Sequence, residues 1–129
     1  MIGLLLGMLL AAPTLAPDLT VGPAAYYDAS YDNGGWDHII ALRRSWGQID
    51  DSFPLSPDGY YCAHPTYPLG TQLIVMNAVT GEAVQCVVAD VVAPKDRGFW
   101  ERSVVIELSY RAYVAAGGKQ FNRFVVYES

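Results

Sequence analysis

Two short stretches of the chain carry the residue types that proton transfer requires. His64 stands just before a Pro- and Gly-punctuated turn, and that turn leads into an apolar run over residues 72–76. Asp90 comes at the end of a second apolar run, over residues 83–89. A histidine and a carboxylate at the ends of two neighbouring strands can exchange protons with a bound substrate. His64 and Asp90 are therefore the candidates for acid–base chemistry from which the functional argument starts.

The N-terminal segment 1–16 is typical of a secretory signal. It contains no charged side chain, and an apolar block over residues 2–12 is followed by Pro13 and small residues. The block is too short for an ordinary membrane-spanning helix. We therefore predict a signal-like segment over 1–16 and one domain over 17–129, in a protein that is exported to the periplasm, the cell wall or the medium. An uncleaved anchor or a buried segment is the alternative, because no Lys or Arg precedes the block.

Length and charge exclude several classes of function. The chain has 129 residues, enough for one domain, and a net charge of −5 with only 8 Lys and Arg. Such a chain lacks the basic stripe that nucleic acids require, and it has no glycine-rich phosphate loop. It also has no clustered His and Cys ligands and no Asp-rich calcium loop. We expect a monomer that uses no nucleotide, cofactor or metal and binds no nucleic acid.

The two cysteines, Cys62 and Cys86, suit an oxidising compartment. They enclose a loop of about 25 residues, for which a disulfide would stabilise the fold by roughly 3 kcal/mol. Two small buried thiols are the alternative, because spacing alone does not place their β-carbons.

The pattern of apolar residues and turn residues predicts a small, mainly β barrel with one or two short helices. Residues 47–59, rich in acids, Pro and Gly, read as a loop. Ser109 is placed to cap a helix that Gly117 and Gly118 end. The expected strands are 24–30, 72–76, 83–89, 103–106 and 121–127, and the expected helices are 38–46 and 109–116.

Three motifs in the same order resemble the rare lipoprotein A family. Residues 63–71, AHPTYPLGT, look like its AAHxTLPxGT segment, and residues 80–90, TGEAVQCVVAD, resemble its NGxSVVVRVND strand. Residues 104–112, VVIELSYRA, are similar to its RIIDLSxAA element, and AYY at 25–27 looks like a diverged form of its opening strand. The resemblance covers about residues 24–128. It implies a six-stranded double-psi β-barrel, the fold that expansins and barwin-like proteins also use.

The resemblance also implies chemistry on cell-wall glycans. Active members of the family are lytic transglycosylases that cleave peptidoglycan strands, and their catalytic histidine and aspartate fall on His64 and Asp90. The sugar's own C6 hydroxyl would close a 1,6-anhydro ring without water. Ordinary glycosidases use two carboxylates, so a second well-placed acid would indicate hydrolysis. A non-catalytic, expansin-like module that binds wall glycans is the alternative, and a secreted inhibitor is a third possibility.

The chain departs from the family pattern directly after Asp90. The family has DRGPF at its aspartate, whereas here an Asp96-Arg97-Gly98-Phe99 string comes six positions later. The position of the family's aspartate relative to the strand before it selects Asp90 as the acid. Its position relative to the later motif, in which Glu107 stands, selects Asp96. Glu107 replaces the family's aspartate before Leu-Ser, and we interpret it as structural.

Aromatic side chains near the motifs are candidates for sugar binding, because pyranose rings stack on apolar ring faces. Packing in the barrel core is the alternative for all of them. The candidates are Tyr60, Tyr61, Tyr67 and Trp100. We expect His38, Asp50, Asp51 and Asp58 to be solvated loop residues.

Overall fold

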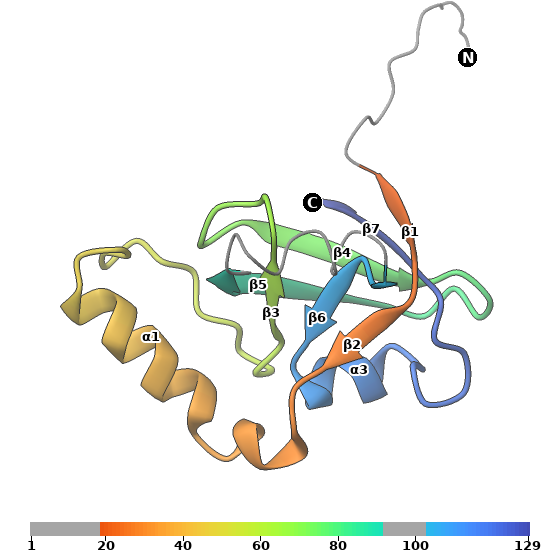
Figure 1. Cartoon of the computed structure of the whole chain (residues 1–129), viewed down its shortest axis with the longest axis horizontal. Helices are drawn as coiled ribbons and strands as arrows, with labels where there is room; N and C mark the ends of the chain where they lie inside the picture. The colour runs from red at the N-terminus through yellow and green to blue at the C-terminus, as the bar shows by residue number, and fades with distance from the viewer. Residues whose placement is uncertain (1–18, 92–102) are drawn as a thin grey trace, which may run out of the picture.

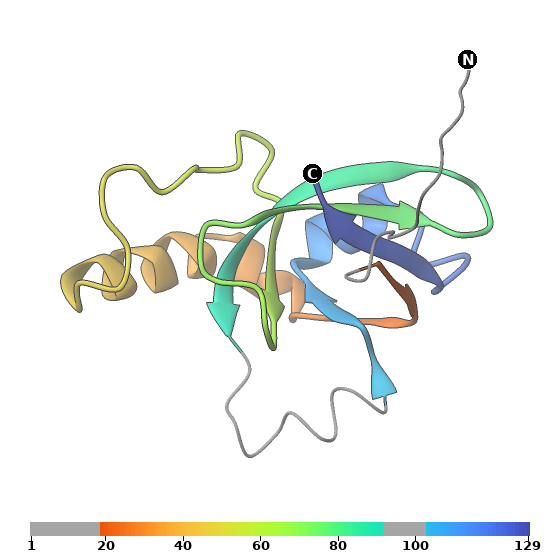
Figure 2. The same cartoon turned by 90° about the horizontal axis from the view of Figure 1, so that it is seen from above.

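A computed structural model describes residues 19–91 and 103–129. In this part of the chain seven strands form one nearly closed, barrel-like sheet with two short helices (Figures 1 and 2). The elements are β1 (Thr20–Gly22), β2 (Ala24–Tyr26), the 3-10 turn η1 (Ala29–Asp32), α1 (Gly35–Ser45), β3 (Tyr61–His64), β4 (Gln72–Asn77), β5 (Ala83–Val91), β6 (Ile106–Leu108), α3 (Tyr110–Ala115) and β7 (Phe124–Glu128).

A single kinked segment supplies both edges of the sheet. The strand order is β1-β7-β4-β5-β3-β6-β2, and only Pro23 separates β1 from β2. Proline has no N–H to give to a ladder, so pairing changes partner there: β1 runs antiparallel to β7 and β2 parallel to β6. The Asn122 side chain, just before β7, adds a second link to the start of β2. Its Oδ1 accepts the Ala24 N–H (2.8 Å), and its Nδ2 donates to the Ala24 carbonyl (3.0 Å).

The barrel interior is filled by alternate residues of the long strands. In β4 the side chains of Leu73 and Val75 are fully buried, whereas their neighbours are exposed or half-buried, which is the period-two pattern of a strand with one face inward. The fully buried hydrophobic residues of this interior are Cys62, Leu73, Val75, Cys86, Val88, Ile106, Leu108, Ala112, Ala116, Phe124 and Val126.

A second apolar cluster lies between α1 and the sheet. Trp36 and Ile40 of α1 are buried together with Tyr61 of β3 and with Val87 and Ala89 of β5. The rings of Trp36 and Tyr61 are stacked, with centroids 5.6 Å apart. This cluster fixes α1 against the outer face of β3 and β5, so polar side chains on the same face of α1 lie over the sheet.

The expected mainly β barrel is confirmed, but the described residues form seven strands where the resemblance implies six. Neither β1 nor β3 is among the five expected strand ranges: β1 is only three residues long, and all four residues of β3 are buried, so neither shows a period-two pattern. The strand expected over 24–30 ends at Tyr26, because Asp28 accepts the Ser30 N–H and turns the chain into η1. The expected helix over 38–46 starts earlier, at Gly35, and the strand expected over 103–106 starts later, at Ile106. Ser109 caps α3 as predicted, accepting the Ala112 N–H.

None of the helices in the described part of the chain has the length and apolar character that crossing a membrane requires. The signal-like segment 1–16 lies outside the described residues.

We predict that Cys62 and Cys86 form a disulfide when the protein folds under oxidising conditions. Both thiols are free in the structure and fully buried, and their Sγ atoms are 3.3 Å apart. Closing this loop of about 25 residues should raise the free energy of unfolding by about 3 kcal/mol. Alkylation after denaturation, followed by intact-mass measurement, should find no free thiol, and reductant should lower the melting temperature. Two alkylated thiols in protein prepared with an oxidised glutathione buffer would contradict the prediction.

Candidate functional site

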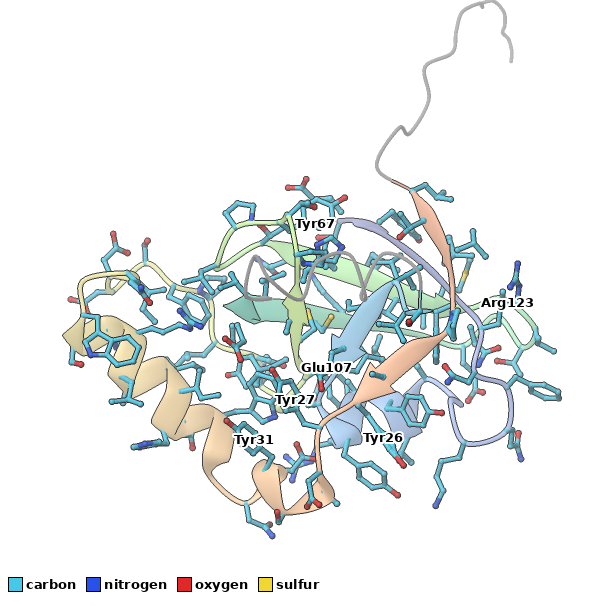
Figure 3. All side chains as sticks on the ribbon, viewed as in Figure 1. Tyr26, Tyr27, Tyr31, Tyr67, Glu107 and Arg123 are labelled. Atoms are coloured by element: carbon cyan, nitrogen blue, oxygen red, sulfur yellow. The ribbon has the colours of Figure 1, made fainter. Side chains whose placement is uncertain are left out.

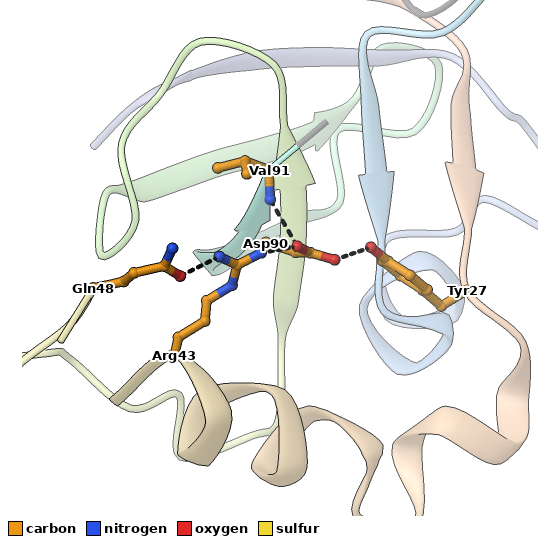
Figure 4. Close-up of polar contacts among 5 residues, drawn as sticks. All are labelled: Tyr27, Arg43, Gln48, Asp90 and Val91. Atoms are coloured by element: carbon orange, nitrogen blue, oxygen red, sulfur yellow. Dashed lines mark hydrogen bonds and ion pairs between the residues drawn. The ribbon is translucent and has the colours of Figure 1, made fainter. Parts of the chain in front are cut away.

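The carboxylate of Asp90 is the centre of a polar network at the end of β5 (Figure 4). Tyr27 donates its phenolic O–H to Oδ2 (2.8 Å), and Arg43 of α1 forms an ion pair with Oδ1. Arg43 also donates to Gln48 Oε1 (2.7 Å). The Val91 N–H donates to the Asp90 Oδ1 (2.9 Å). The carboxylate is one-fifth exposed, so the partners hold it in place without covering it.

A β-bulge turns Asp90 toward α1. The parallel register of β3 and β5 pairs Cys62 with Val88 and then Ala63 with Asp90, which leaves Ala89 as an extra residue. Val87 and Ala89 belong to the cluster under α1, whereas Val88 faces the barrel interior. Strict alternation would therefore aim Asp90 inward, but a bulge breaks the alternation and re-aims the following side chain. The contact with Arg43 shows that Asp90 lies on the α1 side.

A second carboxylate, that of Glu107, shares a row of the sheet with Asp90. Ala63 of β3 is the register partner of Asp90 on one side and of Glu107 of β6 on the other. Residues directly opposite one another in a sheet project from the same face. The two carboxylates are thus two strand spacings apart, about 10 Å between their α-carbons, with only the methyl group of Ala63 between them.

The environments of the two carboxylates differ. Burial, and then the negative charge of Asp90, raise the pKa of Glu107 above its ordinary value. Asp90 instead has the Arg43 guanidinium as an ion-pair partner. Burial and the charges of Asp90 and Glu107 also raise the pKa of Tyr27, which keeps its proton and its hydrogen bond to Asp90. Figure 3 shows Tyr27, Tyr31 and Glu107 gathered on this side of the sheet.

This arrangement can divide acid–base work between the two groups. A carboxyl whose pKa is raised keeps its proton to a higher pH than an ordinary glutamate does and can donate it, and an ionised carboxylate can accept one. The sequence did not indicate that Glu107 lies beside Asp90, and among the described residues no backbone amide is seen to donate to its carboxylate.

His64 is the last residue of β3 and precedes the turn that leads into β4, but its ring is engaged locally. Nδ1 accepts the N–H groups of Thr66 and Tyr67, each at 3.2 Å, so the proton of the neutral ring is on Nε2. The ring is buried, and burial lowers the pKa of His64 to about 4. Its register partner is Val91, one position beyond Asp90. Among the described residues, no hydrogen bond joins His64 to Asp90.

The predicted aromatic residues are spread over different environments. Tyr61 is buried and stacked on Trp36, with its oxygen accepting the Ser56 N–H (3.0 Å). Tyr60 is half-buried against the barrel core. The ring of Tyr67 is half-buried and lies 4.6 Å from that of His64. Trp100 and Asp96, the alternative acid, lie outside the described residues.

Sequence reasoning missed the two partners that hold Asp90. Tyr27 follows the opening strand directly, and the AYY motif at 25–27 could have drawn attention to it. No motif in the sequence indicates that Arg43 contacts Asp90. The two residues are 47 positions apart, and Arg43 stands on a helix that belongs to none of the motifs.

A surface cavity of about 430 Å³ adjoins this network on the side of Gln48. It is lined by the loop over residues 47–54 together with Leu69 and Gly70, mostly with polar groups. Gln48 lines the cavity and also accepts a hydrogen bond from Arg43, so the cavity is connected to Asp90 through two side chains.

No protein-family model and no curated protein matches this chain. Within residues 19–91 and 103–129, no group of three His, Cys, Asp or Glu side chains is arranged to hold a metal ion.

We predict that His64 makes the fold more stable near neutral pH than at pH 4. Unfolded histidine binds a proton below about pH 6.5, whereas the pKa of folded His64 is about 4. Between these values the unfolded state binds more protons, so the free energy of unfolding falls as the pH decreases through this range. The variant His64→Asn retains an acceptor for the two amides without titrating. Urea unfolding at several pH values should show a stability difference that changes between pH 7 and 4, and parallel pH profiles would contradict the assignment.

We also predict that Asp90 contributes to the raised pKa of Glu107. NMR titration of the side-chain carboxyl carbons should give Glu107 a pKa above that of an exposed glutamate. In Asp90→Asn this pKa should move down toward the ordinary value, because one of its two causes is removed. The exposed Glu128 provides the internal control. A Glu107 titration that is unchanged in the variant would contradict electrostatic coupling between the two groups.

Proposed function

We propose that this barrel cleaves cell-wall glycan strands of the peptidoglycan type by acid–base catalysis at Asp90 and Glu107. The observation that carries the proposal is the row Asp90–Ala63–Glu107, which places two carboxylates in unlike environments on one face of three adjacent strands. The three family-like motifs indicate the substrate class, because Asp90 ends one of them and Glu107 stands within another.

The proposed reaction uses the carboxylates in different roles. Protonated Glu107 donates its proton to the glycosidic oxygen as the C1–O bond breaks. The carboxylate of Asp90 accepts the proton of the same sugar's C6 hydroxyl as O6 forms a bond to C1, which yields a 1,6-anhydro end. The proton balance closes, and no water, metal or cofactor is consumed. In this scheme Glu107 donates the proton that the sequence assigned to Asp90 as the acid, Asp90 is the acceptor, and His64 takes no part.

Tyr27 and Arg43 act as positioning residues for Asp90. The phenol binds one carboxylate oxygen and the guanidinium the other, so the carboxylate has a defined orientation. Charge-assisted hydrogen bonds of this kind are among the stronger polar contacts in proteins. The one-fifth of the side chain that remains exposed is the part that a substrate hydroxyl can reach.

Hydrolysis is the second candidate, and the carboxylate pair itself favours it. Inverting glycosidases place two carboxyl groups about 6.5–9.5 Å apart so that a water molecule fits between base and sugar. A backbone separation of about 10 Å is of this order. The two reactions differ in their products, because hydrolysis leaves a reducing end and the intramolecular reaction leaves an anhydro end that is lighter by one water.

The test is incubation of the purified protein with glycan strands that lack stem peptides, followed by mass analysis of the ends. We expect new anhydro-muramyl ends, with the rate reduced at least about 100-fold in Asp90→Asn and in Glu107→Gln, the range expected for loss of a general acid or base. The matched control is Asp96→Asn, which should retain activity. New reducing ends would support hydrolysis instead of the anhydro reaction.

Two outcomes would contradict the catalytic proposal. Binding of strands without any new ends would favour the non-catalytic, expansin-like module. Activity that is lost in Asp96→Asn but retained in Asp90→Asn would assign the catalytic carboxylate to Asp96 instead of Asp90.

A further inference from the structure

The cavity beside Gln48 combines polar side chains that solvent can reach with a smaller apolar surface. Its volume of about 430 Å³ lies within the range of ligand pockets, about 300–1,000 Å³. Gln48, Asp50 and Ser52 are exposed, and the apolar part of the lining includes the half-buried Ile49 and Leu69. A ligand that covers polar groups must bond to them, because unpaired polar groups are costly once water is removed. The lining therefore favours a polar ligand that carries an apolar group.

The side-chain amide of Gln48 has a fixed orientation. Its Oε1 accepts a hydrogen bond from Arg43 Nη1 (2.7 Å), and its backbone N–H donates to the Arg43 carbonyl (2.9 Å). A guanidinium has donors only, so the amide oxygen and not the nitrogen must face it. Figure 4 shows the nitrogen outside this contact, and among the described residues no group accepts a hydrogen bond from it. Gln48 therefore has a donor left for a molecule in the cavity.

The carboxylate of Asp50 has an acceptor left at the same cavity. Its Oδ1 accepts both donors of Ser52, the hydroxyl and the backbone N–H (2.8 Å). These hydrogen bonds lower the pKa of Asp50, so the group is ionised at neutral pH. Within residues 19–91 and 103–129, Oδ2 has no hydrogen-bond partner. Asp50 is the one charged side chain among the residues that line the cavity, so the cavity repels negatively charged ligands.

We propose that this cavity is a subsite for an N-acetylhexosamine of the glycan strand. The acetamido carbonyl accepts from Gln48 Nε2, and the acetamido N–H donates to Asp50 Oδ2. The methyl group of the same substituent covers the apolar surface of Ile49 and Leu69. A ring hydroxyl donates to Ser52 Oγ, whose own proton is used by Asp50. The choice of a sugar rests on the proposed function, whereas the choice of an acetamido group rests on the donor, the acceptor and the apolar surface of the lining.

Gln48 connects this subsite to the carboxylate of Asp90. The amide that binds the sugar also holds Arg43, and the guanidinium of Arg43 pairs with Asp90. Asp90 itself does not line the cavity, so the sugar bound here is a neighbour, along the strand, of the sugar that reacts. Binding energy from such a remote residue can orient the reacting bond. A sugar in the cavity thus holds Gln48 in place and, through it, the cation beside the acid.

The test is an NMR titration with the monosaccharide N-acetyl-D-glucosamine, followed through the backbone N–H resonances of residues 47–52. D-glucose and D-glucosamine are the comparators, because the first lacks the acetamido group and the second carries an ammonium in its place. We expect a saturable shift with N-acetyl-D-glucosamine and none with the comparators at the same concentrations. The monosaccharide has no glycosidic bond to cleave, so its binding does not depend on catalysis.

The variant Gln48→Glu separates the two contacts of this side chain. A glutamate still accepts from Arg43 but has no N–H to donate, so binding should weaken about tenfold, the size expected for one lost hydrogen bond. Asp50→Asn keeps an acceptor for Ser52 and replaces the second oxygen by a donor, so it should weaken binding by a similar factor. The matched control is Gln120→Glu, which makes the same charge change at an exposed residue between α3 and β7 and should bind as the unmodified protein does.

The proposal is overturned if N-acetyl-D-glucosamine gives no saturable shift, if D-glucose or D-glucosamine gives an equal one, or if binding is unchanged in both Gln48→Glu and Asp50→Asn. Asp90→Asn should lose cleavage of strands and retain binding of the monosaccharide. A protein that binds the monosaccharide and cleaves no strand would contradict the catalytic proposal alone. A protein that cleaves strands without binding at this cavity would contradict the subsite alone.

Discussion

The four-residue strand β3 determines how its two neighbours, β5 and β6, are placed relative to each other. All four of its residues are buried, and it pairs in parallel with β5 and antiparallel with β6. Cys62 faces the barrel interior, whereas Tyr61 contributes to the cluster under α1. A large residue in place of Ala63 would separate the side chains on its two neighbours. The methyl group at this position is what allows Asp90 and Glu107 to influence each other across the strand.

The helix α1 supplies the cation, Arg43, that pairs with the half-buried carboxylate of Asp90. Charges that leave water are costly unless they are paired and hydrogen-bonded. Trp36 and Ile40 pack α1 on the sheet, and the same packing presents Arg43 to Asp90. The apolar cluster and the ion pair are therefore parts of one arrangement: the hydrophobic contact determines where the cation lies, and the cation allows the acid to stay partly buried.

Sequence periodicity could predict the elements but not their mutual orientation. The change from apolar to polar residues at Asp90 is visible in the sequence and lies one residue before the end of β5, whereas β3, which ends at His64, is not among the predicted strands. The bulge at Ala89 exists only relative to β3, so no reading of β5 alone could show that Asp90 faces α1 and that His64 has another register partner. The same holds for Glu107, whose neighbourhood is set by pairing across β3, and for Arg43, which reaches Asp90 only after α1 has docked.

The kink at Pro23 has a consequence for how the chain folds. The segment that closes the barrel comes near the start of the described chain, whereas its partners, β6, β7 and Asn122, come near the end. Contacts between such distant positions cost loop-closure entropy before they contribute any energy, and they slow folding. During synthesis β4 and β5 can pair as a local hairpin, but β1 and β2 must wait for nearly the whole chain. Closure of the barrel is thus a late event in folding, and the order of the strands along the chain imposes it.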